Sequence, residues 1–427
     1  MVVIVGSGAG GGILAMELAL ANIPVTIVEK GPFINVNDAF NCYDEFDEPI
    51  DLLKTTCLGG STVVAAGNGV RVLEKELNNL GINISNELDE VEKLLSIHPM
   101  NDNCFGEGTR KIMDVANDLD LDVKKMPKFI RDNECIPCGH CSFGCLQNAK
   151  WSSIDFVRIA IDNGAKLLCN SEVVDIVIED NKVKGVRVRK NHKDEDFKDG
   201  NFRDEDCKDE SFKDEDFNTL IESDLVILAA GAIDSAILLQ KIGIKAGEKL
   251  FIDSFVTIGG KLKNINFNKE IQMNALIKGR NFILSPHYAQ FIANELKKEA
   301  TDKKDILGIM IKIPDDNYGK IKDGKVIKEN SIKDVRFIAE GSAIAGAILI
   351  EAGVDPNSII STNLRGAHPG GTAAIGEIVN ENLESEINGL FVSDASVLPK
   401  SPGAPPILTI LALSKRLSKY IINNCSG

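Results

Sequence analysis

The chain has 427 residues, of which 44% are hydrophobic and 26% are charged, and its formal net charge at pH 7 is −15. This length allows two or three domains with a large core, and the composition is that of a globular protein. The acidic balance argues against nucleic acid as a partner, because a surface that binds phosphates must be basic. The longest uncharged apolar stretch of the second half, 341–350, is about half as long as a membrane-spanning helix, so we expect no transmembrane segment. No basic and apolar leader precedes the first predicted strand, which indicates a cytoplasmic protein.

The N-terminal residues predict a nucleotide-binding unit. Residues 2–5 are typical of a buried strand, 10–21 of a helix and 25–28 of a second strand. The turn at 6–11 has the G-x-G-x-x-G spacing with which a Rossmann fold brings a pyrophosphate to the N–H groups of a helix N-terminus. An acid follows the second strand, where a carboxylate accepts hydrogen bonds from a ribose and would repel the 2′-phosphate of NADP. The candidate residues are Gly6, Gly8, Gly10, Gly11, Glu29 and Lys30.

Two further segments favour FAD over NAD. The turn at 59–62 is a second glycine-rich turn and suits the remainder of a longer dinucleotide. The segment 225–232 is a buried strand that runs into small residues, among them Ala230 and Gly231, which can lie close to a ribose or an adenine. Together with the N-terminal fingerprint, these segments predict an FAD site.

Four cysteines within eleven residues predict a metal site in a reducing compartment. Cys135, Cys138, Cys141 and Cys145 have the C-x2-C-x2-C-x3-C spacing of a bacterial ferredoxin, which indicates an iron–sulfur cluster, [4Fe–4S] in preference to [3Fe–4S]. Zinc fits less well, because a zinc ribbon needs a long spacer between its two C-x2-C knuckles. Zinc and unmetallated thiols stay open as alternatives. The fourth ligand is Cys145, a distant thiol or absent; the distant candidates are Cys57 and Cys104.

Downstream, a charged low-complexity segment separates two strand-like segments. Residues 193–217 are a tandem array of five charged pentapeptides with little apolar surface, so we expect a solvated loop insertion. Further along, 306–313 alternates weakly as a strand does, and Asp323-Gly324 is typical of a hairpin turn. The remaining predicted elements are a helix over 332–352, a short buried strand over 390–393 and an apolar helix over 407–422 after Pro405-Pro406.

This order of elements predicts an α/β protein with a Rossmann-type FAD-binding domain, a discontinuous α+β substrate domain and a cysteine-rich, cluster-binding insertion. We place the FAD-binding domain over 1–75, 151–250 and 366–427. The helical and cysteine-rich insertion is predicted over 76–150, and the substrate or cap domain over 251–365.

Several of these segments together resemble the glucose–methanol–choline oxidoreductase family. They are the N-terminal fingerprint with Glu29, CLGGSTVVAAGNG (57–69), SEVVDI (171–176), VILAAGAIDSAILL (226–239), HPGGTAAIG (368–376) and GLFVSDASVLP (389–399). The resemblance runs along the whole chain except the repeat and implies an extended FAD. By that resemblance, the FAD contacts are Gly60, Ser61 and Asn68 along the cofactor, Val173 near the adenine, Asp394 and Ala395 at the ribityl–pyrophosphate, and Thr409 near the flavin pyrimidine.

The resemblance also implies a catalytic base and reveals one departure from the family. His368 stands in the sequence AHPGGT, and the family's histidine at this position faces the flavin N5 and takes the hydroxyl proton while hydride leaves the carbinol carbon. A second histidine or asparagine usually precedes the proline of the C-terminal helix. Here Pro405 occupies that position, and its side chain can neither donate nor accept a hydrogen bond.

The cysteine run completes the expected function. It is similar to the CxxCGxCxxGCxxxAK stretch of electron-transferring dehydrogenases of the same family, some of which carry an iron–sulfur centre. We therefore expect an FAD-dependent dehydrogenase of a hydroxylated small molecule, whose electrons leave through the cluster to a one-electron acceptor protein such as a ferredoxin. Because of Pro405, a reductase of an activated double bond remains an alternative, and an electron-relay flavoprotein subunit is a second one. An open, polar pocket beside His368 would favour an enzyme.

Overall fold

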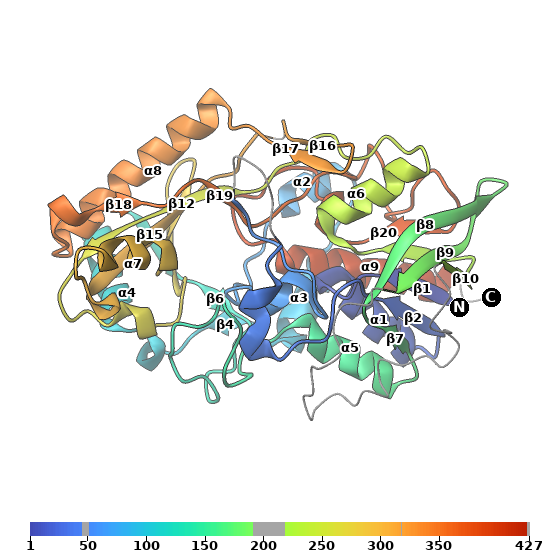
Figure 1. The fold of residues 1–427 in the computed structure, drawn as a ribbon, viewed down its shortest axis with the longest axis horizontal. Helices are drawn as coiled ribbons and strands as arrows, with labels where there is room; N and C mark the ends of the chain where they lie inside the picture. Colours follow the sequence, from blue (N-terminus) through green and yellow to red (C-terminus); the bar gives the residue numbers. More distant parts are fainter. Residues whose placement is uncertain (45–50, 191–217, 317, 425–427) are drawn as a thin grey trace.

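The computed structural model describes residues 1–44, 51–190, 218–316 and 318–424, so the pentapeptide repeat at 193–217 lies outside the described residues. Figure 1 shows two bodies side by side, one built on a parallel sheet and the other on a mostly antiparallel sheet flanked by helix α8 (Ile332–Glu351). The α/β fold predicted from the sequence is confirmed. The predicted domain boundaries stay a prediction.

A five-stranded parallel sheet forms the centre of the first body. Its order is β20-β11-β1-β2-β7, and every neighbouring pair is parallel. The strands are buried on both faces, which explains why they read as short continuous runs of aliphatic residues. Their bounds are β1 Val2–Val5, β2 Val25–Val28, β7 Lys166–Leu168, β11 Val226–Leu228 and β20 Leu390–Val392.

Helices cover both faces of this sheet, as a Rossmann-type fold requires. Helix α1 lies between α5 and α9 and contacts both (Figure 1). A Cβ at Gly10 would lie 1.8 Å from the Ser393 carbonyl oxygen, so this close approach needs glycine. The helices are α1 Ala9–Leu20, α5 Ser153–Asp162, α6 Gly231–Lys241 and α9 Ile407–Asn424.

A small antiparallel sheet extends from the first body. It has the order β10-β9-β8, with β8 at Ser171–Glu179, β9 at Lys182–Lys190 and β10 at Thr219–Glu222. Strands β9 and β10, which precede and follow the pentapeptide repeat in the sequence, pair antiparallel, and the sequence predicts strands on both sides of the repeat.

The second body is built on an eight-stranded sheet. Seven of its strands have the order β3-β19-β12-β15-β14-β13-β5, which we call the seven-membered sheet, and the eighth, β18 (Ile360–Ser361), also pairs with β12. Helices α4 (Glu107–Asp118) and α8 pack against each other and against strands of this sheet, and α7 (Gln290–Lys297) contacts β12. The strands are β3 Asp51–Leu52, β5 Asp122–Lys125, β12 Ser254–Lys261, β13 Ala275–Lys278, β14 Ile283–Pro286, β15 Ile306–Lys312 and β19 Arg365–Gly366.

The smaller elements agree with the sequence. Strands β16 (Lys320–Lys322) and β17 (Lys325–Ile327) form the hairpin predicted around Asp323-Gly324. The later predicted helices and strands are confirmed to within two residues at each end. Among the described residues, no helix is long and apolar enough to span a membrane. The short elements not yet named are α2 Glu74–Asn79, α3 Ser85–Leu94, β4 His98–Pro99 and β6 Pro127–Lys128.

Candidate active site

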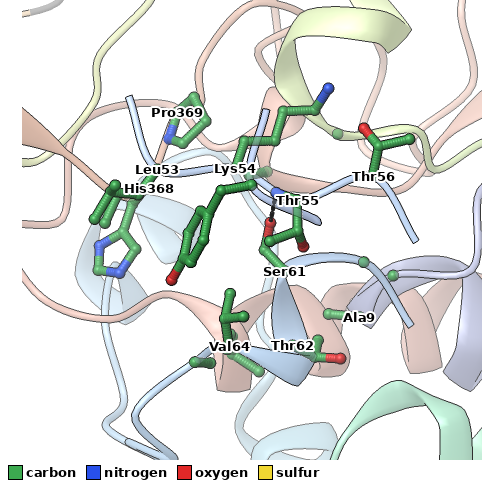
Figure 2. Close-up of a pocket in the computed structure, with 18 of the residues that line it drawn as sticks. Ala9, Leu53, Lys54, Thr55, Thr56, Ser61, Thr62, Val64, His368 and Pro369 are labelled. Atoms are coloured by element: carbon green, nitrogen blue, oxygen red, sulfur yellow. Dashed lines mark hydrogen bonds between the residues drawn. The ribbon is translucent and has the colours of Figure 1, made fainter. Parts of the chain in front are cut away.

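A cavity of about 720 Å³ lies between the parallel sheet and the seven-membered sheet. Figure 2 shows His368 and Pro369 on one side of the cavity and Ala9 and Thr62 on the other. Thirteen of the fifteen predicted cofactor residues line it: Gly6, Gly8, Gly10, Glu29, Lys30, Gly60, Ser61, Asn68, Val173, Ala230, Gly231, Asp394 and Ala395.

The glycine-rich turn after β1 needs its glycines for contact with the backbone of a neighbouring strand. Gly6 has a φ of +100°, and a Cβ there would lie 2.4 Å from the Ala229 carbonyl oxygen. The turn leads directly into α1, so the N–H groups at the start of this helix face the cavity end where a pyrophosphate binds in a Rossmann fold.

The carboxylate of Glu29 holds this turn in place. Its Oε2 accepts hydrogen bonds from the N–H of Ser7 at 3.0 Å and from the Ser7 hydroxyl at 2.6 Å, while Oε1 accepts from the Gly31 N–H at 2.8 Å. The Ser7 hydroxyl oxygen in turn accepts from the Gly59 N–H at 2.9 Å, so the two glycine-rich turns are joined. Burial raises the pKa of Glu29, against the effect of these hydrogen bonds.

Asp394, which follows β20, has a corresponding role on the other side of β1. Its Oδ2 accepts from the Gly231 N–H at 2.9 Å and from the Ser235 hydroxyl at 2.6 Å, and its Oδ1 accepts from the Ser396 N–H at 2.8 Å. Burial raises the pKa of this carboxyl group. Asp394 therefore fixes the turn after β11 at the cavity wall.

Two predicted residues lie away from the cavity. A Cβ at Gly11 would lie 2.0 Å from the Gly6 carbonyl oxygen, so this glycine serves the packing of α1 against the turn. The Thr409 hydroxyl donates to the Val72 carbonyl oxygen at 2.8 Å instead of facing the cavity. The start of α9 still reaches the cavity, through Pro405, Pro406, Ile407 and Ile410.

His368 lines the cavity and is oriented by a buried carboxylate that the sequence did not reveal. Its Nδ1 lies 2.8 Å from Oδ2 of Asp253, a fully buried side chain. An ionised carboxylate can only accept, so Asp253 favours the tautomer whose Nδ1–H donates to it and whose Nε2 is unprotonated. Burial and the charge of Lys312 lower the pKa of His368 to about 4, although Asp253 acts in the opposite direction. The imidazole is therefore neutral at pH 7.

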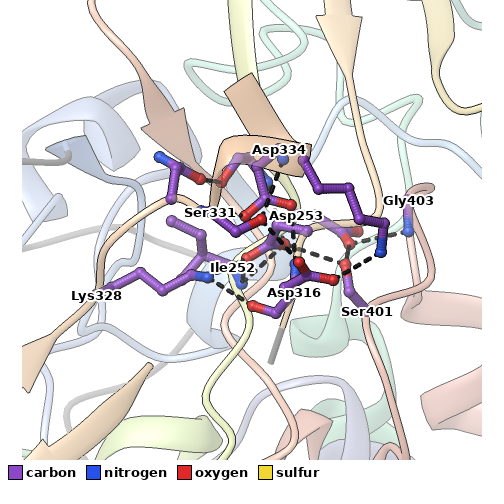
Figure 3. Close-up of polar contacts among 12 residues, drawn as sticks. Ile252, Asp253, Asp316, Lys328, Ser331, Asp334, Ser401 and Gly403 are labelled. Atoms are coloured by element: carbon purple, nitrogen blue, oxygen red, sulfur yellow. Dashed lines mark hydrogen bonds and ion pairs between the residues drawn. The ribbon is translucent and has the colours of Figure 1, made fainter. Parts of the chain in front are cut away.

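Asp253 belongs to a network of buried charges behind His368 (Figure 3). Its Oδ1 accepts from the Ser401 hydroxyl and from the Gly403 N–H. The Ser401 hydroxyl also lies 3.1 Å from Oδ1 of Asp315, which forms an ion pair of 2.9 Å with Lys328. This network joins the start of β12 to the segment between β20 and α9.

Lys312 is a second residue that the sequence analysis missed. Its Nζ donates to the Asp253 carbonyl oxygen at 3.1 Å, lies 3.5 Å from Nδ1 of His368 and is 4.8 Å from the centre of the Phe255 ring. Burial lowers the pKa of Lys312 to about 8, although Asp253 and Asp315 act in the opposite direction. The sequence could have pointed to this residue, because a lysine ends the otherwise apolar segment ILGIMIK, and this segment forms a strand that is buried throughout.

The four cysteines of the ferredoxin-like run line one small pocket, together with His140, Gln147, Lys150 and apolar side chains. Cys57 lines the large cavity instead, and Cys104 packs nearby without lining the small pocket. Within the described ranges, no three His, Cys, Asp or Glu side chains are grouped so that they could hold a metal ion. The described geometry therefore brings the four thiols around a common space, without showing a metal site.

The small pocket adjoins the large cavity. Ser142 and Phe143 line the large cavity, whereas Cys141 and Gly144 on either side of them line the small pocket. The Lys150 ammonium, at the small pocket, donates to three backbone carbonyl oxygens between Thr62 and Ala65, along the wall of the large cavity.

Known proteins resemble this chain in sequence and in fold. Two GMC oxidoreductase family models match residues 9–265 and 331–414. An uncharacterized protein of Methanocaldococcus jannaschii is 32% identical over 98% of this chain and 99% of its own length. A long-chain-alcohol oxidase of Arabidopsis thaliana is 23% identical over 100% of this chain and 68% of its own length. The crystal structure of pyridoxine 4-oxidase from Mesorbium loti superposes with a TM-score of 0.72, at 14% identity over 99% of both chains.

The fold and the cavity thus define a dinucleotide-binding oxidoreductase. The chain belongs to the GMC oxidoreductase family, and the predicted FAD is the cofactor that this family implies. The cavity fits it, since glycine-rich turns and a helix N-terminus meet at one end and His368 at the other.

The first prediction concerns Glu29. Glu29→Gln should weaken FAD binding by about 1–3 kcal/mol, because an amide cannot accept all the hydrogen bonds that both carboxylate oxygens receive from Ser7 and Gly31. Titration of the apoprotein with FAD measures the change in Kd. Glu248→Gln, at an exposed position, is the matched control and should bind FAD as the wild type does. An unchanged Kd for Glu29→Gln would show that this carboxylate does not support the cofactor.

The second prediction concerns the ion pair between Lys328 and Asp315, whose side chains are 2% and 0% exposed. Lys328→Met should lower the free energy of unfolding by about 3–5 kcal/mol, because it leaves a buried carboxylate without its counter-charge. Urea denaturation measures this loss. Lys325→Met, at an exposed position on the same hairpin, should change stability by about 0.5 kcal/mol or less. Equal stabilities of the two variants would contradict the prediction.

Proposed function

We propose that this protein is an FAD-dependent dehydrogenase that oxidises the CH–OH group of a hydroxylated small molecule. The observation that carries the proposal is the 2.8 Å contact between Nδ1 of His368 and the buried Asp253, because it leaves Nε2 free to act as a base in the cavity. Similar plant proteins are named long-chain-alcohol oxidases, which supports an alcohol as substrate. The cytoplasm remains the proposed location.

In this proposal the chain supplies the proton acceptor and the walls of the site. The turns at Gly6, Gly8 and Gly60 would hold FAD, which would supply the hydride acceptor. His368 takes the hydroxyl proton at Nε2, and Asp253 stabilises the imidazolium that forms. Pro405 lines the cavity where the family's second polar residue would stand, so it supplies shape but no hydrogen bond.

The cavity disfavours the two alternatives. An electron relay needs no room for a substrate, whereas His368 lines an open cavity with polar side chains such as Gln272 and His287. A reductase of a double bond would need a proton donor, and His368 cannot be that donor at neutral pH, because its low pKa leaves the imidazole unprotonated. Both features favour a base and a bound alcohol.

We further propose that Cys135, Cys138, Cys141 and Cys145 hold an iron–sulfur cluster, [4Fe–4S] in preference to [3Fe–4S]. The four thiols surround a common pocket, and a cluster needs its ligands around a space whereas a single ion needs them at one point. Burial and the neighbouring thiols raise the pKa of Cys135 to about 12, which agrees with thiols gathered in a small volume. A bound cluster would pass electrons singly, and the acceptor would be a one-electron carrier protein such as a ferredoxin.

The third prediction tests the base. His368→Ala should slow reduction of the flavin by an alcohol about 10²- to 10⁴-fold while FAD stays bound. Because the pKa of His368 is about 4, the wild-type rate should be constant from neutral pH to about pH 5.5 and fall only as the pH drops through about 4. Anaerobic stopped-flow measurements with pH jumps record both effects.

A conservative variant separates orientation from folding. Asp253→Asn should lower the rate at every pH and shift the acid limb downward, because it removes the carboxylate that raises the pKa of His368. His98→Ala, at an exposed histidine, is the control. An acid limb near pH 6.5 in the wild type, or a normal rate in His368→Ala, would contradict the assignment of the base.

The fourth prediction tests the cluster. Cys138→Ser should lose iron and acid-labile sulfide but keep FAD, since the two sites use different residues. Its flavin should still be reduced by substrate, whereas transfer to a one-electron acceptor should fail. Cys104→Ser, whose thiol packs nearby without lining the small pocket, should keep the iron. Stoichiometric zinc, or no metal in anaerobically purified protein, would overturn the cluster.

A further inference from the structure

The seven-membered sheet presents a row of three side chains to the cavity. Phe255 on β12 pairs directly with Lys312 on β15 and with Arg365 on β19. Directly paired residues on adjacent strands share one face of a sheet, and all three line the cavity. The row therefore places an aromatic ring between two cations on the wall beside His368.

The negatively charged side chains that line the cavity lie at its nucleotide end, whereas its sheet end is lined by positive charges. In the part of the chain that the structure describes, the lining carboxylates all lie at the nucleotide end: Glu29, Glu172, Asp234 and Asp394. The lysines at that end have partners there, such as Lys30 with Glu172 at 3.2 Å. At the sheet end, the charged lining residues are Lys312 and Arg365.

The counter-charges of these two cations lie outside the cavity wall. Nε of Arg365 donates to Oδ2 of Asp51 at 3.2 Å, and Asp51 does not line the cavity. Within the described residues, no hydrogen bond or ion pair engages Nη1 or Nη2 of Arg365, two nitrogens with which a guanidinium can bind a carboxylate. Asp253, which offsets the charge of Lys312, is hydrogen-bonded to His368, Ser401 and Gly403 behind the wall.

We propose that the substrate is a hydroxy acid whose carboxylate binds Arg365 and whose hydroxyl group lies at Nε2 of His368. The inference rests on the proposed alcohol dehydrogenase function and names its substrate class. Arg365 and Lys312 stand two strands apart, a separation of about 10 Å between their Cβ atoms, so a chain of several carbons along Phe255 spans them. Lys312 lies beside the base, with its Nζ 3.5 Å from Nδ1 of His368, and lines the same cavity wall as Arg365.

The test compares matched substrates on the holoenzyme. The wild type should reduce its flavin with 6-hydroxyhexanoate at a far lower KM than with hexane-1,6-diol, which has the same length but no charge. Arg365→Gln should raise the KM for the hydroxy acid about 10- to 100-fold, leave its kcat nearly unchanged and leave the diol unaffected. Arg365→Lys should restore part of the affinity, since it keeps the charge but not the planar fork.

A binding measurement separates this inference from the proposed function. Calorimetry on the oxidised holoenzyme should show that hexanoate binds the wild type and binds Arg365→Gln more weakly, and that hexan-1-ol does not distinguish the two. This result would support acid recognition even if no alcohol reduced the flavin, in which case the dehydrogenase proposal alone would fail. Equal hexanoate binding by both proteins would overturn the inference. It would also be overturned if Arg365→Gln shifted the flavin potential and left binding unchanged, because the row would then serve the cofactor.

Discussion

The hydrogen bonds of the Asp253 carboxylate join the two halves of the molecule. Asp253 immediately precedes β12 of the seven-membered sheet, and its oxygens bind His368, Ser401 and Gly403, which come from segments that flank β20 of the parallel sheet. Its backbone φ is +51°, a left-handed conformation that aspartate tolerates better than most residues. The position of His368 relative to the nucleotide turns therefore depends on one buried aspartate with a left-handed backbone, and on the charged groups that balance its carboxylate.

Burial has opposite consequences at the two ends of the cavity. At the nucleotide end, the carboxylates of Glu29 and Asp394 accept hydrogen bonds from backbone N–H groups and hydroxyls, so they fix the turns that line the cofactor cavity. At the sheet end, burial keeps the imidazole of His368 neutral and lowers the pKa of Lys312 beside it. The same desolvation thus gives a rigid binding surface in one place and a reactive one in the other.

Local patterns predicted the elements that depend on neighbouring residues in the chain. The fingerprint, the buried strands and the hairpin at Asp323-Gly324 could be read because their signals lie within a few residues. The partnership of Asp253 with His368 could not, because it joins residues 115 positions apart. Arg365 and Lys312 escaped notice for the same reason, since strand register alone places them in one row. Thr409 lies on the predicted helix but on a face turned from the cavity, which a family resemblance does not resolve.

Asp253 also limits how this protein can be altered. Glycine would suit the left-handed backbone but offer no acceptor to His368, and asparagine would suit the backbone but carry no charge. Glutamate would keep the charge but carry it one methylene further from the imidazole. Arg365 and Phe255 occupy ordinary strand positions, so a substitution there does not also have to satisfy a left-handed backbone. Selection for new substrates therefore has freedom along the sheet wall and almost none at the residue that orients the base.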